Sequence, residues 1–488
     1  MRPNQQWMVI LFALTLAAGT CWSQDTAPQQ ANPAGGAAAP GAPVQTVTSP
    51  GTPSSSPKLQ PDTHPLGGAY LFSLGSALEQ HSYFQPEFSI FEGAQTNAQQ
   101  FVPGSSQGTL VATLPTVELS LTHNSRTNSL SAAYLGGGVI YDNSPSFSTS
   151  FHMANLSDSI QFRRWALNLG DQFTYLPSAS YGFGGMGIPG GIGAGFSSGF
   201  GFAGGLGGLG QINPAFTASQ SILTSQFGAY SNTSLAELGY SASPRTSVTF
   251  TGLYGTLQAG KRGQGFISSN QAFGVVGVNR VLTARDTISV DYTYWRFGYV
   301  GLPESFYTQM VELAYGRKIT GRLSFQAYGG PELMRYQTRG LGSTSRTYAT
   351  ATGALSYQRG KNVFGIYAGR YATAGSGVLA GATTTMVDLN WARQVTRKWS
   401  MSVYGGNSRN SGLLTSAGLS SSNTHFDYWF GNAVVTHAIS RFTSLFISYE
   451  YQRQASSSTG CRGEVCALGL ARQMFGVGIT FTPRPRGL

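Results

Sequence analysis

The stretch Leu445-Phe446-Ile447-Ser448-Tyr449-Glu450-Tyr451-Gln452 alternates between two kinds of side chain. Every second residue from Leu445 to Tyr451 is apolar or aromatic, and the residues between them are mostly polar. This period of two is that of a β-strand, whose successive side chains point to opposite faces. The same alternation occurs at 117–122 and 288–293. Each such strand therefore separates an oily surface from a wetter one.

Eight short links, each with a basic residue, interrupt the series of strands. They are centred near residues 126, 163, 245, 285, 320, 360, 397 and 441, so the intervals by subtraction are about 37, 82, 40, 35, 40, 37 and 44 residues. With one exception, each interval holds two strands of about 10 to 13 residues, one tight turn and one longer loop, as in hairpins that cross an outer membrane. Eight tight turns join sixteen strands, and one further strand at each end makes eighteen.

The pattern predicts an all-β protein, a transmembrane antiparallel up-and-down β-barrel of about 18 strands over residues 82–482. Sixteen strands are left open in case one pair near residues 82–123 or 147–176 is misread. The first strand is expected at 82–91 and the last at 468–481, which places both ends and the tail 483–488 on the tight-turn, periplasmic side. Closure satisfies the backbone hydrogen bonds in lipid. Aromatic residues near the links, such as Trp295, Trp399 and Tyr428, are expected to form girdles at the membrane surfaces.

Composition agrees with a barrel and excludes other classes. Only 10% of the 488 residues are charged, against about 25% in soluble domains. The one sustained apolar run, 7–18, is shorter than the roughly 20 residues of a spanning helix, which excludes a polytopic helical protein. The net charge of +11 does not indicate nucleic acid, because the basic residues are spread singly over turns and rims.

The N-terminal region has the features of an exported protein. Residues 1–23 read as a signal peptide, residues 24–66 as a disordered Pro/Ala-rich periplasmic tether, and residues 67–81 as a short lead-in segment. Whether Cys21, which lies in a lipoprotein-like sequence, is lipidated is left open. Cys461 and Cys466 are candidates for a disulfide in an oxidising compartment, with two free thiols as the alternative.

The polar face of the strands predicts the residues that line the lumen. Inward candidates on different strands are the carboxylates Glu118, Glu237, Asp291, Glu312, Asp388 and Glu450. Nearer the rims, the inward candidates are Arg280, Arg370, Arg393 and Arg472. Charges inside a barrel of this size set the ion preference of a diffusion channel. The alternative is that they pair with one another and fill a plugged barrel.

Nothing in the sequence indicates an enzyme. None of the six histidines belongs to a metal-spaced motif such as HExxH, and no serine is marked as a nucleophile. We therefore expect no catalytic residue, no metal site and no cofactor. The expected partners are outer-membrane lipid, lipopolysaccharide and the barrel assembly machinery. Homo-oligomerisation is left open, and no nucleic-acid partner is expected.

The interval of about 82 residues contains a glycine-rich segment, residues 177–228. Its match to GxGxxG at 185–190 carries no weight, because a segment that is half glycine produces it by chance. The segment lies on the long-loop side and should be an extracellular loop. Its apolar residues include Phe183, Ile188, Phe196, Phe200 and Phe202, which are unlike those of a solvated linker. Our hypothesis is that the loop narrows the pore, and whether it plugs the lumen or faces outward is left open.

Two segments carry a resemblance to known proteins. RRWALNLGDQFTYLPSASYGFGG at 163–185 and GVGITFTPRP at 476–485, together with the leader and the regular hairpins, resemble porin-like outer-membrane β-barrels and uncharacterised acidobacterial barrels. The resemblance covers roughly 82–485 and transfers no catalytic residue. It implies a location in the bacterial outer membrane and a channel for passive diffusion of small polar or ionic solutes. A polysaccharide export or assembly barrel and a surface adhesion or scaffold barrel are the alternatives. The chain departs from classical barrels in the seven residues that follow Phe481.

Overall fold

The structure of the protein is a computed structural model that describes most of the predicted barrel region. The described residues are 82–96, 109–125, 127–142, 149–176, 229–259, 268–301, 304–338, 342–373, 381–413, 425–457 and 470–487. The predicted signal peptide, tether and lead-in segment, the glycine-rich loop and its five named apolar residues, and Cys21, Cys461 and Cys466 lie outside these ranges. Among the described residues, no helix has the length and apolar character needed to cross a membrane.

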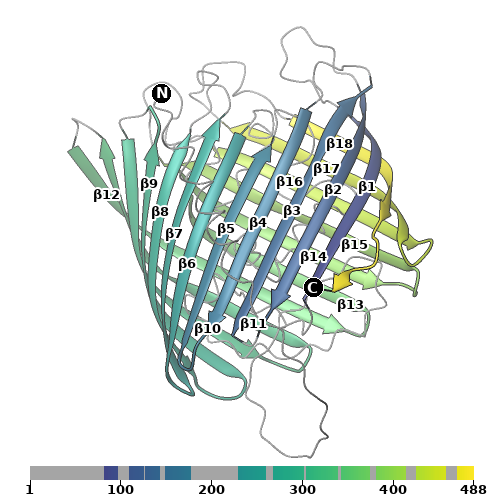
Figure 1. Ribbon diagram of the computed structural model, residues 1–488. Helices are drawn as coiled ribbons and strands as arrows, with labels where there is room; N and C mark the ends of the chain where they lie inside the picture. The colour runs from purple at the N-terminus through teal and green to yellow at the C-terminus, as the bar shows by residue number, and fades with distance from the viewer. Residues whose placement is uncertain are drawn as a thin grey trace, which may run out of the picture. The chain divides into compact units, whose positions relative to one another are not determined.

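Eighteen long strands form one closed antiparallel sheet, each paired with its neighbours in the sequence (Figure 1). The strands are β1 (Tyr83–Gln95), β2 (Leu110–Asn124), β3 (Asn128–Tyr141), β4 (Thr149–Gln161), β5 (Trp165–Leu176), β6 (Ala229–Ser243), β7 (Thr246–Ala259), β8 (Ser269–Val281), β9 (Asp286–Tyr299), β10 (Glu304–Lys318), β11 (Leu323–Thr338), β12 (Gly342–Arg359), β13 (Asn362–Thr373), β14 (Ala382–Gln394), β15 (Trp399–Gly412), β16 (His425–Ala438), β17 (Thr443–Ser457) and β18 (Leu470–Phe481). The predicted up-and-down barrel of 18 strands is confirmed, and the alternative count of sixteen is wrong.

The barrel closes where β18 pairs with β1, with eight Cα partners from Phe88–Phe481 to Gln95–Met474. A nineteenth strand of two residues, β19 (Arg486–Gly487), also pairs with β1, at Tyr83 and Phe84. Residues that follow Phe481 therefore add to the edge of the first strand. Because the ring is complete, the described strands leave no long unpaired edge in the membrane.

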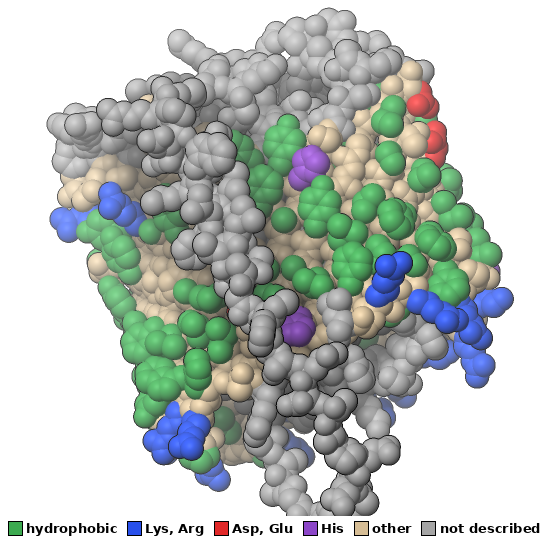
Figure 2. All heavy atoms as spheres, in the orientation of Figure 1, with side chains coloured by type: hydrophobic (Ala, Val, Ile, Leu, Met, Phe, Trp, Pro, Cys, Tyr) green, Lys and Arg blue, Asp and Glu red, His purple; other side chains and the backbone are tan. Residues whose placement is uncertain are grey.

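The alternation in β17 has the physical meaning predicted from its sequence. Leu445, Ile447 and Tyr449 are 41–43% exposed on the outer face, whereas Ser448 and Gln452 are at most 2% exposed on the inner face. Exposed large apolar side chains recur around the outer wall, for example at Val290, Leu313 and Phe475. In the view of Figure 2, such side chains are spread over the middle of the wall. An outer surface of this kind is suited to lipid.

The eight predicted tight links are all present, as connections of two to four residues between β2 and β3 and every second pair thereafter. The other side is less regular than predicted, because β9–β10 and β11–β12 are joined by four and three residues. The strands are also longer, at 12 to 18 residues. A tilted strand needs only about 9 to 11 residues to span the hydrocarbon, so the longest strands extend beyond it.

Four of the tight turns share one hydrogen-bond pattern that sequence reasoning missed. The hydroxyl of Thr283, Thr320, Thr396 or Ser440 accepts hydrogen bonds from the backbone N–H groups two and three residues later, at 3.0–3.2 Å. Thr and Ser favour turns because they can bond the local backbone in this way. The signal in these links is thus the hydroxyl at the second of the four linking residues, and the basic residue only fills an exposed site.

Replacement of Thr320 by Ala should lower the free energy of unfolding by about 1 kcal/mol, because the turn then loses two backbone partners. The measurement is urea unfolding of the barrel in lipid vesicles, followed by tryptophan fluorescence. Thr320→Ser keeps the hydroxyl and serves as the control. Equal losses in the two variants would contradict the role given to the hydroxyl.

The predicted aromatic girdles are correct only in part. Trp399 is 46% exposed on the outer face at the tight-turn end and contacts His437, with ring centroids 4.4 Å apart. Trp295 and Tyr428, however, are each 2% exposed and lie on the inner face. Both lie near a strand end as expected, but their position in the alternation places them inside the barrel.

Candidate functional site: the inner wall

The inner wall of the barrel carries mostly negative charge. All six carboxylates predicted from the sequence lie on inward-facing positions, and so do two that were missed, Glu87 and Glu332. Among the described side chains of the strands, the inward-facing basic residues are Lys318, at the tight-turn end of β10, and Arg346, close to the other end of β12. The described middle of the inner wall is therefore acidic.

The inward placement predicted for arginine is wrong for three residues. Arg280, Arg370 and Arg393 are exposed and alternate in step with outward side chains such as Val278, Ile366 and Leu389. Each lies within three residues of a strand end, where a long side chain can reach the polar membrane surface. The side chain of Arg472 lies outside the described part of the chain.

Three of the carboxylates gather on adjacent strands. Asp291 of β9 and Glu312 of β10 are Cα partners, and Glu332 of β11 pairs with Met310, two residues from Glu312. They are 0%, 6% and 1% exposed. Asp291 accepts a hydrogen bond from the Ser289 hydroxyl at 2.5 Å, and Glu312 accepts one from Thr293 at 3.4 Å. We call Asp291, Glu312 and Glu332 the acidic trio.

A close approach of two strands holds the trio together. Between β10 and β11 the regular pairing skips the residues opposite Val311 and Glu312. At this point Gly330 lies against the Val311 carbonyl so closely that any Cβ on residue 330 would overlap it. Only glycine allows this contact, because every other residue carries a Cβ. The sequence Gly329-Gly330-Pro331 thus positions the neighbouring Glu332 beside Glu312.

An aromatic cluster lies next to the trio, toward the end of the barrel opposite the tight turns. Trp295 and Phe297 of β9 contact each other and join Phe273 and Phe306, with ring centroids 4.4–5.2 Å apart along this chain. Tyr336 of β11 packs on Phe306 at 5.9 Å. The inner wall is therefore less uniformly polar than the alternation predicted. The faces of aromatic rings attract cations, as carboxylates do.

The remaining inner carboxylates also have polar neighbours. Glu237 accepts hydrogen bonds from Asn168 and Thr251 at 3.1 and 3.3 Å. Glu87 and Glu118 are Cα partners beside the closure, and Thr482 donates to Glu87 at 2.9 Å. Within the described ranges, no group of three or more His, Cys, Asp or Glu residues has an arrangement that could hold a metal ion.

A closed barrel with an apolar outer wall and an acidic, hydroxyl-rich inner wall defines the class of the protein. It is a transmembrane β-barrel, and the inner wall is the surface that a solute inside the barrel would contact.

Comparison with known proteins does not assign the chain to a family. No protein-family model matches the chain, and no curated protein matches its sequence. Similar solved structures are outer-membrane porins. Pseudomonas aeruginosa OpdQ is 10% identical, with 83% of this chain and 98% of that chain covered and a TM-score of 0.40. P. aeruginosa OccK2 (OpdF), solved with glucuronate, is 9% identical, with 83% and 98% covered and a TM-score of 0.41. Acinetobacter baumannii OccAB3 is 8% identical, with 82% and 99% covered and a TM-score of 0.39.

Proposed function

We propose that the protein is an outer-membrane channel for passive diffusion of small polar or ionic solutes, and that it prefers cations. The observation that supports this proposal is the charge of the inner wall. Barrels of 16 to 18 strands leave room for water inside. Here the described inward carboxylates are Glu87, Glu118, Glu237, Asp291, Glu312, Glu332, Asp388 and Glu450, against Lys318 and Arg346 at strand ends.

The burial of the acidic trio strengthens the charge argument. The three carboxylates are at most 6% exposed, so little water reaches them. Charges that are close together and screened from water repel one another strongly. A cation relieves this repulsion and an anion increases it. Carboxylate rings select cations in channels for this reason.

The location and partners of the protein follow from the same proposal. The outer wall would contact outer-membrane lipid and lipopolysaccharide, after export by the N-terminal signal peptide and insertion by the barrel assembly machinery. The similarity of residues 163–185 and 476–485 to acidobacterial barrels belongs to this proposal too. Passive diffusion requires no catalytic residue, cofactor or nucleic acid.

Planar-bilayer recording of the purified full-length protein tests the function. We expect steady conductance steps and, under a KCl gradient, a reversal potential that lies toward the potassium equilibrium potential. Steps with a reversal potential near zero would remove the cation preference but keep the channel. Absence of any conductance from folded protein would reject the channel and favour an export or scaffold barrel.

The glycine-rich loop adds a second expectation to the proposed function. Residues 177–228 connect Leu176 and Ala229, which are Cα partners on β5 and β6, so the whole segment emerges at one point of the barrel end. If it narrows the pore, deletion of 182–210 should raise the single-channel conductance. The control is removal of a similar number of residues from the tether at 24–66. Unchanged conductance would contradict a constricting loop.

A further inference from the structure

The outer wall of the barrel contains one charge in an unexpected place, the carboxylate of Asp171. It is the seventh of the twelve residues of β5 and shares the outer face with exposed Leu169 and Phe173. Every other outward-facing charge on the described strands lies within four residues of a strand end, as Arg453 does on β17. Asp171 is therefore a charge at the middle of the surface that should contact hydrocarbon.

Polar neighbours on β6 accompany this carboxylate. The Asn232 amide donates to its Oδ1 oxygen at 3.1 Å, and the Ser234 hydroxyl donates to its Oδ2 oxygen at 2.6 Å. A carboxylate has about four acceptor positions, so the two hydrogen bonds from described residues do not fill them. On β3 and β4, Tyr134 and His152 form a further outward polar pair, 2.8 Å between the hydroxyl and Nδ1.

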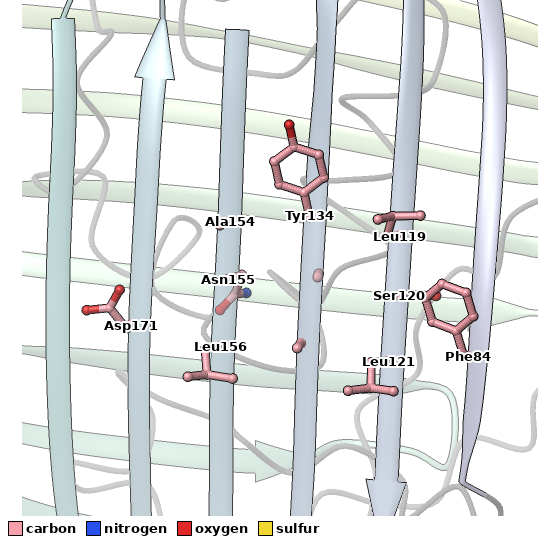
Figure 3. Close-up of a pocket in the computed structure, with 11 residues that line it drawn as sticks. Phe84, Leu119, Ser120, Leu121, Tyr134, Ala154, Asn155, Leu156 and Asp171 are labelled. Atoms are coloured by element: carbon pink, nitrogen blue, oxygen red, sulfur yellow. The ribbon is translucent and has the colours of Figure 1, made fainter. Parts of the chain in front are cut away.

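A groove of about 300 Å³ runs along the outer wall beside Asp171, over β1 to β5 (Figure 3). Its floor is low because Ala132 and Ala154 carry only methyl groups, and Phe84, Leu119 and Leu156 form its walls. Tyr134 and Asp171 lie on either side of Ala154 in Figure 3. Small residues on a membrane-facing surface allow a neighbouring protein to approach closely.

Lipid alone is a poor occupant for this face. Acyl chains offer no hydrogen-bond donor to Asp171, and charged residues within the membrane are rare and pair with other groups. A second barrel of the same kind has what is required. Two copies inserted in the same direction are related by a symmetry axis normal to the membrane. Each residue then lies at the same depth in both copies, so groups at mid-depth face groups at mid-depth.

We propose that the outer face around Asp171, with the groove over β1–β5, is the contact surface between two copies of this chain in the membrane. The face is complementary to itself in chemistry, because it presents the Asp171 acceptor together with the Tyr134 hydroxyl, which can donate to the other copy while it accepts from His152 Nδ1. Outward arginines, which lie near strand ends, stay in the polar layers when two such faces meet. This contact is independent of whether the barrel conducts.

Site-specific photo-crosslinking in intact outer membranes tests the contact. The photoreactive residue p-benzoylphenylalanine is placed at Ala154 of the full-length protein, and two differently tagged versions are co-expressed. We expect a product of twice the chain mass that carries both tags. The control position is Val387, an outward residue near the middle of β14 that is 44% exposed, which should give no such product.

A variant that fills the groove provides the second measurement. Ala154→Trp should reduce the yield of dimer crosslinks from position Ser234 by about tenfold or more, whereas Val387→Trp should leave it unchanged. Both variants should still show the heat-dependent gel mobility of a folded barrel, because each new side chain points outward. A product with a different polypeptide, or no product at Ala154 in folded protein, would overturn the proposal.

Discussion

Simultaneous replacement of Asp291, Glu312 and Glu332 by Asn, Gln and Gln is expected to remove most of the cation preference of the channel. A monovalent cation about 4 Å from one carboxylate gains about 4 kcal/mol at an effective dielectric constant of 20. The three carboxylates lie on adjacent strands, so they act on the same part of the passage. We expect the ratio of potassium to chloride permeability to fall by about tenfold or more, since 1.4 kcal/mol already corresponds to a factor of ten. The measurement is the reversal potential under a KCl gradient.

Two outward carboxylates provide matched controls for this variant. Glu92 of β1 and Asp158 of β4 lie on the outer face near strand ends, so Glu92→Gln with Asp158→Asn changes the net charge without changing the lumen. This control should keep the cation preference. Acidification should lower the preference of the unmodified channel by protonating carboxylates, and should have little effect on the triple variant. Cation preference that persists in the triple variant would assign selectivity to another part of the wall.

The sequence was sufficient for the architecture because two strong constraints leave few alternatives. In β17 the lipid surface and the inner wall demand different side chains at every second residue, so Leu445, Ile447 and Tyr449 separate cleanly from Ser448 and Gln452. The tight turns then fix the number of strands, because each tight turn joins two strands that both cross the membrane. The number of strands could therefore be predicted from the spacing of links such as those at Thr283 and Thr320.

The same reasoning was less accurate for single residues near strand ends, where a long or amphipathic side chain can lie on either face. Arg370 and Arg393 were expected to face the lumen near its rims, but near a strand end an arginine can reach the polar layer from the outer face. Trp295 is amphipathic and close to a strand end, as a girdle residue would be, yet its position in the alternation puts it inside. Alternation was the better guide to orientation in both cases.

The acidic trio and the Asp171 face could not be found without the pairing between strands. Asp291 and Glu312 are 21 positions apart in the sequence, by subtraction, and become Cα partners only in the register that β9 and β10 adopt. Glu332 follows two glycines and a proline, which interrupt the alternation just before it. Asp171 looks ordinary in its own segment, and becomes unusual only when the faces of all described strands are compared.

Replacement of Gly476 and Gly478 by valine is expected to prevent stable closure of the barrel. Gly478 of β18 is the Cα partner of both Phe91 of β1 and Phe446 of β17. The two phenylalanine rings stack in parallel, 5.9 Å between centroids, on the inner face beside it. A Cβ on Gly478 would overlap the Phe446 ring, and one on Gly476 would overlap Phe91 and lie 2.5 Å from the Glu92 carbonyl oxygen. Overpacking of this kind costs about 1 to 3 kcal/mol at each site.

The closure is the place where such a cost has the largest effect on the fold. Pairing of β18 with β1 involves eight Cα partners, against thirteen between β1 and β2, so the backbone ladder at the closure is short. If the rings are displaced and β18 separates from β1, two strands lose their partners inside lipid, where unpaired backbone groups cost several kcal/mol each. The double valine variant should therefore lose the gel mobility shift of a folded barrel, whereas the outward substitution Val477→Leu should retain it.

A double-mutant cycle can separate ring overlap from a general effect of a larger residue in β18. Gly478→Ala should be destabilising alone because the added methyl group meets the Phe446 ring, which is 2% exposed and has little room to move. Phe446→Ala should be destabilising alone because it leaves a cavity. Together, the methyl group no longer has a ring to overlap, so the combined loss should be smaller than the sum by about 1 kcal/mol or more. If the two losses in the free energy of unfolding simply add, Gly478 is required for the backbone conformation of β18. It would then not be required to leave space for the Phe91–Phe446 ring stack.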